Sequence, residues 1–187
     1  MKLNTLQRLA SCIGLLTLCA ALPGCGKGRE KEPVEEKYPG NINPPIGQPV
    51  SLEFHSFTGD DKPGPLVSLS SLKGKVVLID FWATWCPPCI AEMPAILATY
   101  KKLHSKGFEV LGVSLDDEKD ALSKFLKEHD MPWPQYFNPK GVDNEVATQF
   151  GVTIVPALLL VDKQGKLVSV SMSAAKLEAE VAELLAK

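Results

Sequence analysis

The stretch KVVLIDFWATWCPPC, residues 75–89, decides how this chain folds. Its first part, Lys75–Phe81, is a continuous apolar and β-branched run, which predicts a strand buried on both faces. From Cys89 to about Lys106, apolar side chains recur at helical spacing. Cys86 and Cys89 are therefore expected three residues apart, where a buried strand turns into a helix.

That junction favours thiol chemistry. The first turn of a helix presents free backbone N–H groups and the positive end of the helix dipole, and both stabilise a thiolate. The thiolate is the attacking species in thiol–disulfide exchange, so we expect Cys86 to be the nucleophile. Pro87 and Pro88 are tolerated in a first turn but lack N–H groups, which leaves the Cys89 N–H as the main backbone donor to Cys86. Cys89, one turn deeper, is placed to resolve a mixed disulfide.

A cysteine pair can also form a structural disulfide or part of a metal site. A structural disulfide seldom sits at a strand–helix junction flanked by a tryptophan such as Trp85. A zinc site needs two more ligands, and the sequence has no second C-x-x-C and no H-x₃₋₅-H. A copper(I) carrier holding the metal between both thiolates stays an alternative function, although the methionines show no copper-binding spacing. We expect no metal and no cofactor.

The remaining pattern predicts an α/β fold with a mixed sheet, because a strand–helix–strand unit is followed by an antiparallel hairpin and a final helix. In chain order, the other expected strands are Ser51–Phe54, Leu66–Leu69, Phe108–Leu115, Ala157–Val161 and Leu167–Ser171. The other expected helices are Lys119–Glu128, about Asn144–Phe150 and Ala174–Leu185.

The N-terminus has the pattern of an export signal. Lys2 and Arg8 precede the apolar segment Leu9–Leu22, which has the length of a signal-peptide core. The sequence LPGC, residues 22–25, then resembles a bacterial lipobox, in which the chain is cut before Cys25 and the thiol is joined to diacylglycerol. An ordinary secretory signal is the alternative. We expect a signal peptide over 1–24, a flexible tether over 25–46 and one folded domain over 47–187.

Composition limits the partners. The formal net charge is −2 at pH 7, so nothing in the charge balance indicates nucleic acid. The segment from Gly26 to about Pro49 is rich in glycine, proline, lysine and glutamate, which predicts a tether because it buries too little surface to offset ordering entropy.

Residues 80–89 resemble the active site of thioredoxin-fold oxidoreductases, with Pro88 at the proline of the family motif. Pro94 matches the proline that kinks the active-site helix of that family, and Val155-Pro156 matches its cis-proline. The family's cis-proline lies beside the cysteines and guides the substrate backbone. The resemblance therefore implies a thioredoxin-like domain with N-terminal strands and a central insert, a redox disulfide between Cys86 and Cys89, and substrate contacts at Trp85, Pro87, Pro88, Val155 and Pro156.

Within that family the chain looks like the TlpA/ResA-like, AhpC/TSA-related branch of membrane-tethered envelope thioredoxins. The exported tether, the insert from about Asp116 to Phe150 and the carboxylate Glu92 match this branch. The resemblance implies disulfide-containing or dithiol envelope proteins as substrates, a membrane thiol–disulfide relay as electron donor, and a location facing the periplasm or exterior. The reverse direction, as an oxidase or isomerase, stays open. A peroxidase is not favoured, because the Thr-x-x-Cys register from Thr84 falls on Pro87.

Two carboxylates are candidate catalytic groups beside the cysteines. Asp80 ends a buried strand, where the ionised form is costly, so we expect a raised pKa. The family resemblance gives the matching residue a role in proton transfer to the deeper cysteine, and a capping or paired carboxylate is the alternative. Glu92 is either a second proton-transfer group near Cys89 or a favourable charge early in the helix.

Overall fold

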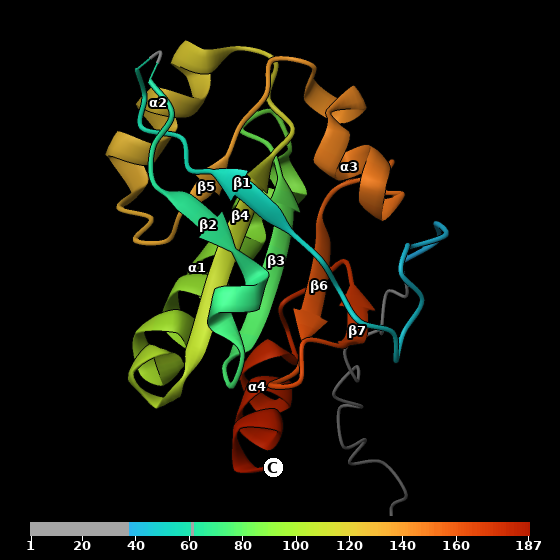
Figure 1. Cartoon of the computed structure of the whole chain (residues 1–187). Coiled ribbons are helices and arrows are strands. Elements are labelled where there is room, and N and C mark those ends of the chain that lie inside the picture. Colours follow the sequence, from blue (N-terminus) through green and yellow to red (C-terminus); the bar gives the residue numbers. More distant parts are fainter. Residues whose placement is uncertain (1–37, 61) are drawn as a thin grey trace, which may run out of the picture. The chain divides into compact units, whose positions relative to one another are not determined.

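The computed structural model describes residues 38–60 and 62–187 (Figure 1). The expected signal peptide over 1–24, the expected lipid attachment at Cys25 and the first part of the expected tether lie outside these residues. Within the described residues, no helix combines the length and the apolar character that crossing a membrane requires.

A five-stranded mixed sheet forms the centre of the described chain. Its middle strand β3 (Val76–Trp82) pairs in parallel with one neighbour and antiparallel with the other. Every residue of β3 is buried, because a strand with partners at both edges and layers on both faces has no exposed side. Across the sheet, the strands follow the order β5 (Gln135–Tyr136), β4 (Phe108–Ser114), β3, β6 (Ala157–Val161) and β7 (Leu167–Ser171).

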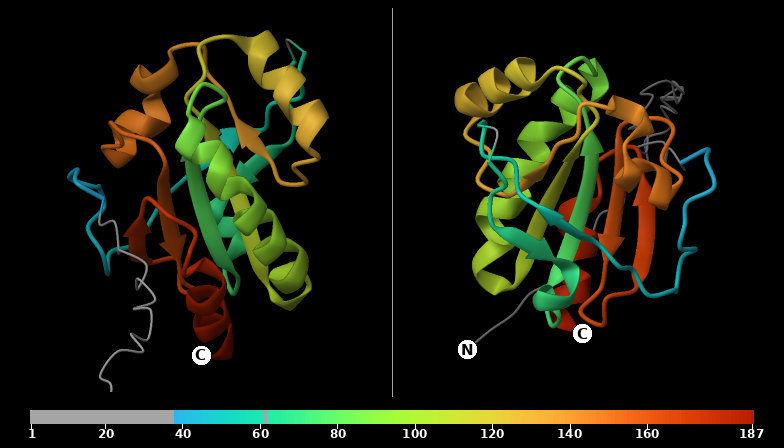
Figure 2. Two further views of the ribbon diagram at one scale, coloured as in Figure 1. Left: turned by 180° about the vertical axis from the view of Figure 1, so that it is seen from behind. Right: turned by 45° about the horizontal axis from the view of Figure 1, so that its top comes forward.

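Alternate side chains of β3 enter two apolar layers on opposite faces of the sheet. Val76 and Leu78 pack with helices α1 (Pro87–Leu103) and α4 (Leu177–Ala186), which lie together on one face (Figure 2). The other face is covered by the hairpin β1 (Glu53–His55)–β2 (Leu66–Ser68) and by helix α3 (Glu145–Phe150). Helix α2 (Lys119–His129) packs beside α1, where Phe125 and His129 line a pocket together with Ile90 and Met93. The mixed sheet with helices on both faces confirms the expected fold class.

Some element boundaries differ from the sequence-based expectation. Helix α1 begins at Pro87 rather than Cys89, because both prolines fit the first turn, where N–H groups have no intrahelical partner. It ends at Leu103 and is followed by a 3₁₀ turn over His104–Lys106. Strand β5, two residues long, was not expected at all, since it is too short to show a period.

The chain joins the fold earlier than residue 47. Residues 38–50, here called the N-terminal strap, contact the segment 149–154 first and then the start of β7. The Gly47 N–H donates to the Leu167 carbonyl at 2.7 Å, and the Leu167 N–H donates to the Gln48 carbonyl at 3.0 Å. At its start the side chain of Tyr38 is only 5% exposed and belongs to the core. The tether expected over 25–46 therefore does not extend through residues 38–46, because the buried side chain of Tyr38 and the hydrogen bonds of Asn43 anchor this segment.

Candidate active site

The two cysteines lie at the N-terminus of α1, just after the loop that connects β3 to this helix. Cys86 is the N-cap residue, and its sulfur accepts the Cys89 N–H at 3.2 Å. A disulfide joins Cys86 and Cys89, with an S–S distance of 2.03 Å and a Cα–Cα distance of 5.3 Å. Cys86 is 4% exposed and Cys89 is 2% exposed, whereas Pro87 and Pro88 between them are exposed. The two sulfurs are therefore mostly covered, and the exposed prolines form the surface directly beside them.

The loop that leads to Cys86 is held by a buried carboxylate. Asp116 accepts the Thr84 N–H at 3.1 Å and the Thr84 hydroxyl at 2.5 Å. The Ser114 hydroxyl also donates to Asp116, at 2.8 Å. Thr84 follows β3 and Asp116 follows β4, and these two strands pair in parallel, so their carboxyl ends meet at one edge. Asp116 thus fixes the backbone two residues before Cys86, and sequence reasoning did not single it out as a site residue.

Asp80 lies in β3, on the face covered by α1. It is 1% exposed, and its Oδ2 atom has no hydrogen-bond partner in the described part of the chain. Burial, and to a smaller extent the nearby charge of Glu92, raises the pKa of Asp80 from 3.8 to about 7. Near neutral pH this carboxyl is divided between its two protonation states, which is the property that a proton-transfer group needs.

Glu92 connects α1 to the segment that enters α4. Its carboxylate accepts the Ala174 N–H at 2.6 Å and lies 3.3 Å from the Ser173 hydroxyl. These contacts give Glu92 a structural task besides its electrostatic effect on Asp80. A role in proton transfer to Cys89 stays a prediction.

An apolar groove opens beside the disulfide. It has a volume of about 250 Å³ and is lined by Trp85, Leu115, Val142 and the segment 152–155. Three of its large apolar side chains are strongly exposed: Trp85 by 52%, Val142 by 48% and Ile154 by 46%. Exposed apolar side chains gathered around a groove mark a site for a partner molecule.

The segment 152–155 leads to Pro156, and the Val155–Pro156 peptide bond is cis, as the resemblance implied. Ala157, the next residue, pairs with Phe81 of β3. Pro156 therefore lies across from the end of β3, at the same edge of the sheet as the cysteine loop. The structure thus brings together Trp85 and Val155 around the groove, whereas Asp80 lies on the α1 face, beneath the active-site helix. In the described residues, no group of three or more His, Cys, Asp or Glu side chains is arranged to hold a metal ion.

A mixed sheet, a disulfide at a helix N-terminus and a cis-proline at the same sheet edge define a thioredoxin-fold thiol–disulfide oxidoreductase. Comparison with known proteins agrees with this class. The sequence model of the AhpC/TSA family matches residues 50–170, and the chain belongs to this family.

Similar proteins and solved structures indicate which thiol–disulfide oxidoreductases this chain resembles. Thiol-disulfide oxidoreductase ResA from Bacillus cereus is 32% identical over 131 residues, which cover 70% of this chain and 74% of the relative. ResA from Bacillus subtilis is 34% identical over 115 residues, covering 62% of this chain and 63% of the relative. The thioredoxin domain of a thiol-disulfide oxidoreductase from Bacteroides vulgatus has a TM-score of 0.66 and 30% identity, covering 75% of this chain and 98% of that one. These similarities support a ResA-like thiol–disulfide oxidoreductase.

Proposed function

We propose that this protein reduces disulfides of bacterial envelope proteins through Cys86 and Cys89 while it is held at a membrane by lipid on Cys25. The basic, then apolar N-terminus and the lipobox-like sequence at residues 22–25 support export and anchoring. The apolar groove beside the disulfide supports a polypeptide substrate, because it offers side-chain contacts next to the reacting sulfurs.

The direction of the reaction, reduction rather than oxidation of the substrate, is inferred from the backbone N–H donors near the Cys86 sulfur. Pro87 and Pro88 fill the first positions of α1 and have no N–H, so the donor at this helix end is the Cys89 N–H at 3.2 Å. A thiol pair is strongly oxidising when its reduced, thiolate form is stabilised. An N-cap side chain accepts from the second or third helical residue, so Pro88 at the second position removes one of the two possible donors to Cys86. The Cys86 thiolate is then less stabilised, and the pair is shifted towards a reducing potential.

The reaction begins with the reduced pair. The Cys86 thiolate attacks one sulfur of the substrate disulfide, and the other substrate sulfur leaves as a thiolate that takes up a proton. Asp80 accepts the proton of Cys89, and the Cys89 thiolate then attacks Cys86. The mixed disulfide breaks, the second substrate thiol is released, and Cys86–Cys89 becomes the disulfide present in this structure. Two electrons pass to the substrate, and a membrane thiol–disulfide relay restores the dithiol.

The test is the reduction potential of the pair. The full chain is equilibrated in graded thiol–disulfide buffers, and tryptophan fluorescence follows the Cys86–Cys89 bond beside the exposed Trp85. A potential near or below the value of about −270 mV typical of thioredoxin supports a reductase. A potential near the value of about −120 mV found for DsbA contradicts the proposed direction and favours an oxidase.

A further inference from the structure

Tyr38 links the N-terminal strap to the active-site loop. Its hydroxyl oxygen accepts the N–H of Thr153 at 3.0 Å and the N–H of Ile154 at 3.2 Å. Both residues line the groove beside Trp85 and directly precede Val155–Pro156. One buried hydroxyl at the start of the described chain thus holds two consecutive amides of the groove wall.

Other strap contacts hold the segment just before this loop. The Asn43 N–H donates to the Phe150 carbonyl at 3.0 Å, and its side-chain amide donates to the Gln149 carbonyl at 3.1 Å. Gly151 follows with φ of +66°, and a Cβ there would clash with the Asn41 carbonyl oxygen. The strap therefore lies directly against the chain that enters the groove wall.

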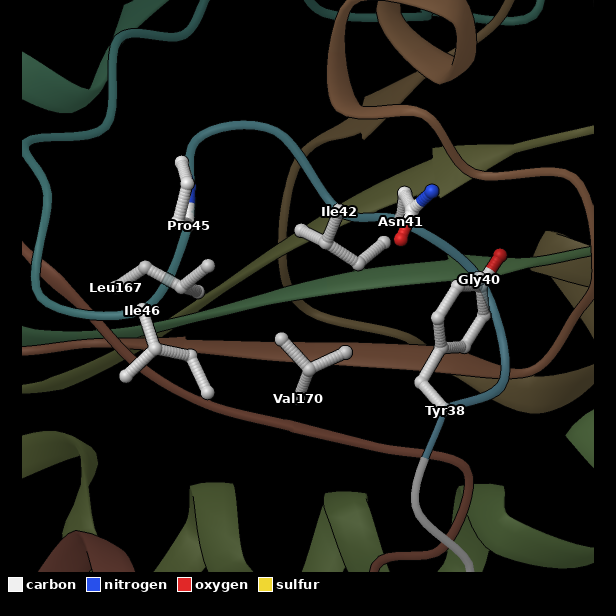
Figure 3. Close-up of a pocket in the computed structure, with 8 residues that line it drawn as sticks. All are labelled: Tyr38, Gly40, Asn41, Ile42, Pro45, Ile46, Leu167 and Val170. Carbon is white, nitrogen blue, oxygen red and sulfur yellow. The ribbon is translucent and has the colours of Figure 1, made fainter.

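The apolar part of the strap packs loosely by comparison. Beneath it lies a cavity of about 440 Å³, lined by Tyr38, Ile42, Ile46, Leu167 and Val170 among others (Figure 3). Ile46 is 61% exposed, so it buries little surface. Directed hydrogen bonds, rather than close apolar packing along the whole strap, thus hold the strap against the loop.

The segment 152–155, here called the groove wall, makes few other hydrogen bonds among the described residues. The Val152 N–H donates to the Ala147 carbonyl at 2.9 Å, which fixes the start of the wall to α3. In the described residues, the Tyr38 hydroxyl is the acceptor for the next two amides, and the side chains of Thr153 and Ile154 are exposed. Loss of that acceptor would leave both amides to water and release the wall between Val152 and Pro156.

We infer that Tyr38 is a positioning residue for substrate binding: its hydroxyl fixes Thr153 and Ile154 and so shapes the groove that receives a polypeptide beside Cys86. This inference rests on the proposed polypeptide substrate. Because the sulfur chemistry is carried by other residues, the hydroxyl affects how a peptide binds and not how the Cys86–Cys89 pair reacts.

The test compares the full chain with its Tyr38→Phe and Tyr136→Phe variants. Tyr136→Phe is the matched control, because Tyr136 is also a buried tyrosine but lies in β5, at the opposite edge of the sheet from β7. Two substrates are used: a fluorogenic peptide closed by an internal disulfide, and the small molecule 4,4′-dithiodipyridine. Hydrogen exchange of the Thr153 and Ile154 amides is measured on the same three proteins.

For Tyr38→Phe, we expect both amides to exchange about fivefold faster and KM for the peptide to rise about fivefold, the change that corresponds to one net hydrogen bond. The rate with dithiodipyridine and the Cys86–Cys89 reduction potential stay unchanged, and Tyr136→Phe changes none of these quantities. Unchanged amide exchange, unchanged peptide KM, or an equal loss with both substrates overturns the inference. A failure of the proposed function gives a different result: the wild-type chain reacts with dithiodipyridine but does not reduce the peptide. In that case the hydrogen exchange of the two amides still tests whether Tyr38 positions Thr153 and Ile154.

Discussion

The buried carboxyl of Asp80 makes the stability of the protein depend on pH in a direction opposite to that of a salt-bridged aspartate. The pKa of Asp80 is about 7 in the folded chain against an ordinary value of 3.8. Between these two pH values the unfolded chain has released the proton and the folded chain has kept it. Folding is then favoured by protons, so stability is fully present below pH 3.8 and is lost as the pH rises to about 7.

The size of the effect follows from the shift in pKa. Each unit corresponds to about 1.4 kcal/mol, so the shift from 3.8 to about 7 corresponds to about 4 kcal/mol at most. Asp80→Asn removes the ionisation while keeping the shape of the protonated carboxyl. We therefore expect the variant and the wild type to have similar stability near pH 4, and the variant to be more stable by up to about 4 kcal/mol at pH 8.

Urea unfolding of the oxidised proteins at several pH values between 4 and 8 measures this difference. Asp143→Asn serves as the control, because it makes the same chemical change at an exposed side chain. In the same variant, reduction of a peptide disulfide at pH 7 slows on the order of 100-fold if Asp80 accepts the Cys89 proton. A stability difference between Asp80→Asn and wild type that stays flat across this range refutes the reasoning about burial.

Three further predictions concern the rest of the site. Cys89→Ser leaves the attacking thiol without its resolving partner, so a mixed disulfide with substrate accumulates and is visible on non-reducing gels, whereas Cys86→Ser forms none. Asp116→Asn loses an acceptor for Thr84 and Ser114, so thermal unfolding shows a loss of about 1–3 kcal/mol, and an unchanged midpoint contradicts the role given to this carboxylate. Cys25→Ser moves the chain from the membrane fraction to the soluble envelope fraction if Cys25 carries lipid, and retention at the membrane argues for another anchor.

The sequence identifies the central strands because their residues are apolar without interruption. β3 and β6 are buried along their whole length, so their apolar runs follow directly from their places in the sheet. The cysteine pair can also be predicted from the sequence, because the two cysteines, the strand before them and the helix after them are consecutive in the chain. Strand β5 is not, because two residues carry no periodicity, and only pairing with β4 makes them a strand.

The supporting residues of the site depend on contacts between distant parts of the chain. Asp116 meets Thr84 only because β3 and β4 pair in parallel, and Tyr38 meets Thr153 across 115 positions of sequence. A single aspartate after a strand or a tyrosine after a charged segment has many possible partners, so neither residue stands out in one sequence. The expected end of the tether at residue 46 is too late for the same reason, because average composition does not show the contacts that individual residues make.

The contacts between the N-terminal strap and the start of β7 also limit the order in which the parts of the protein can fold. Pro49 bridges to Lys166, and the amides of Gly47 and Val50 bond to carbonyls of Leu167 and Gly165. The strap is synthesised early, but its partner strand appears only when most of the chain has been made. Contacts between such distant segments form late, because a long loop must close first. In the proposed export across a membrane, the strap would therefore arrive unpaired, and the start of β7 would stay open to other chains until the strap and β7 are on the same side.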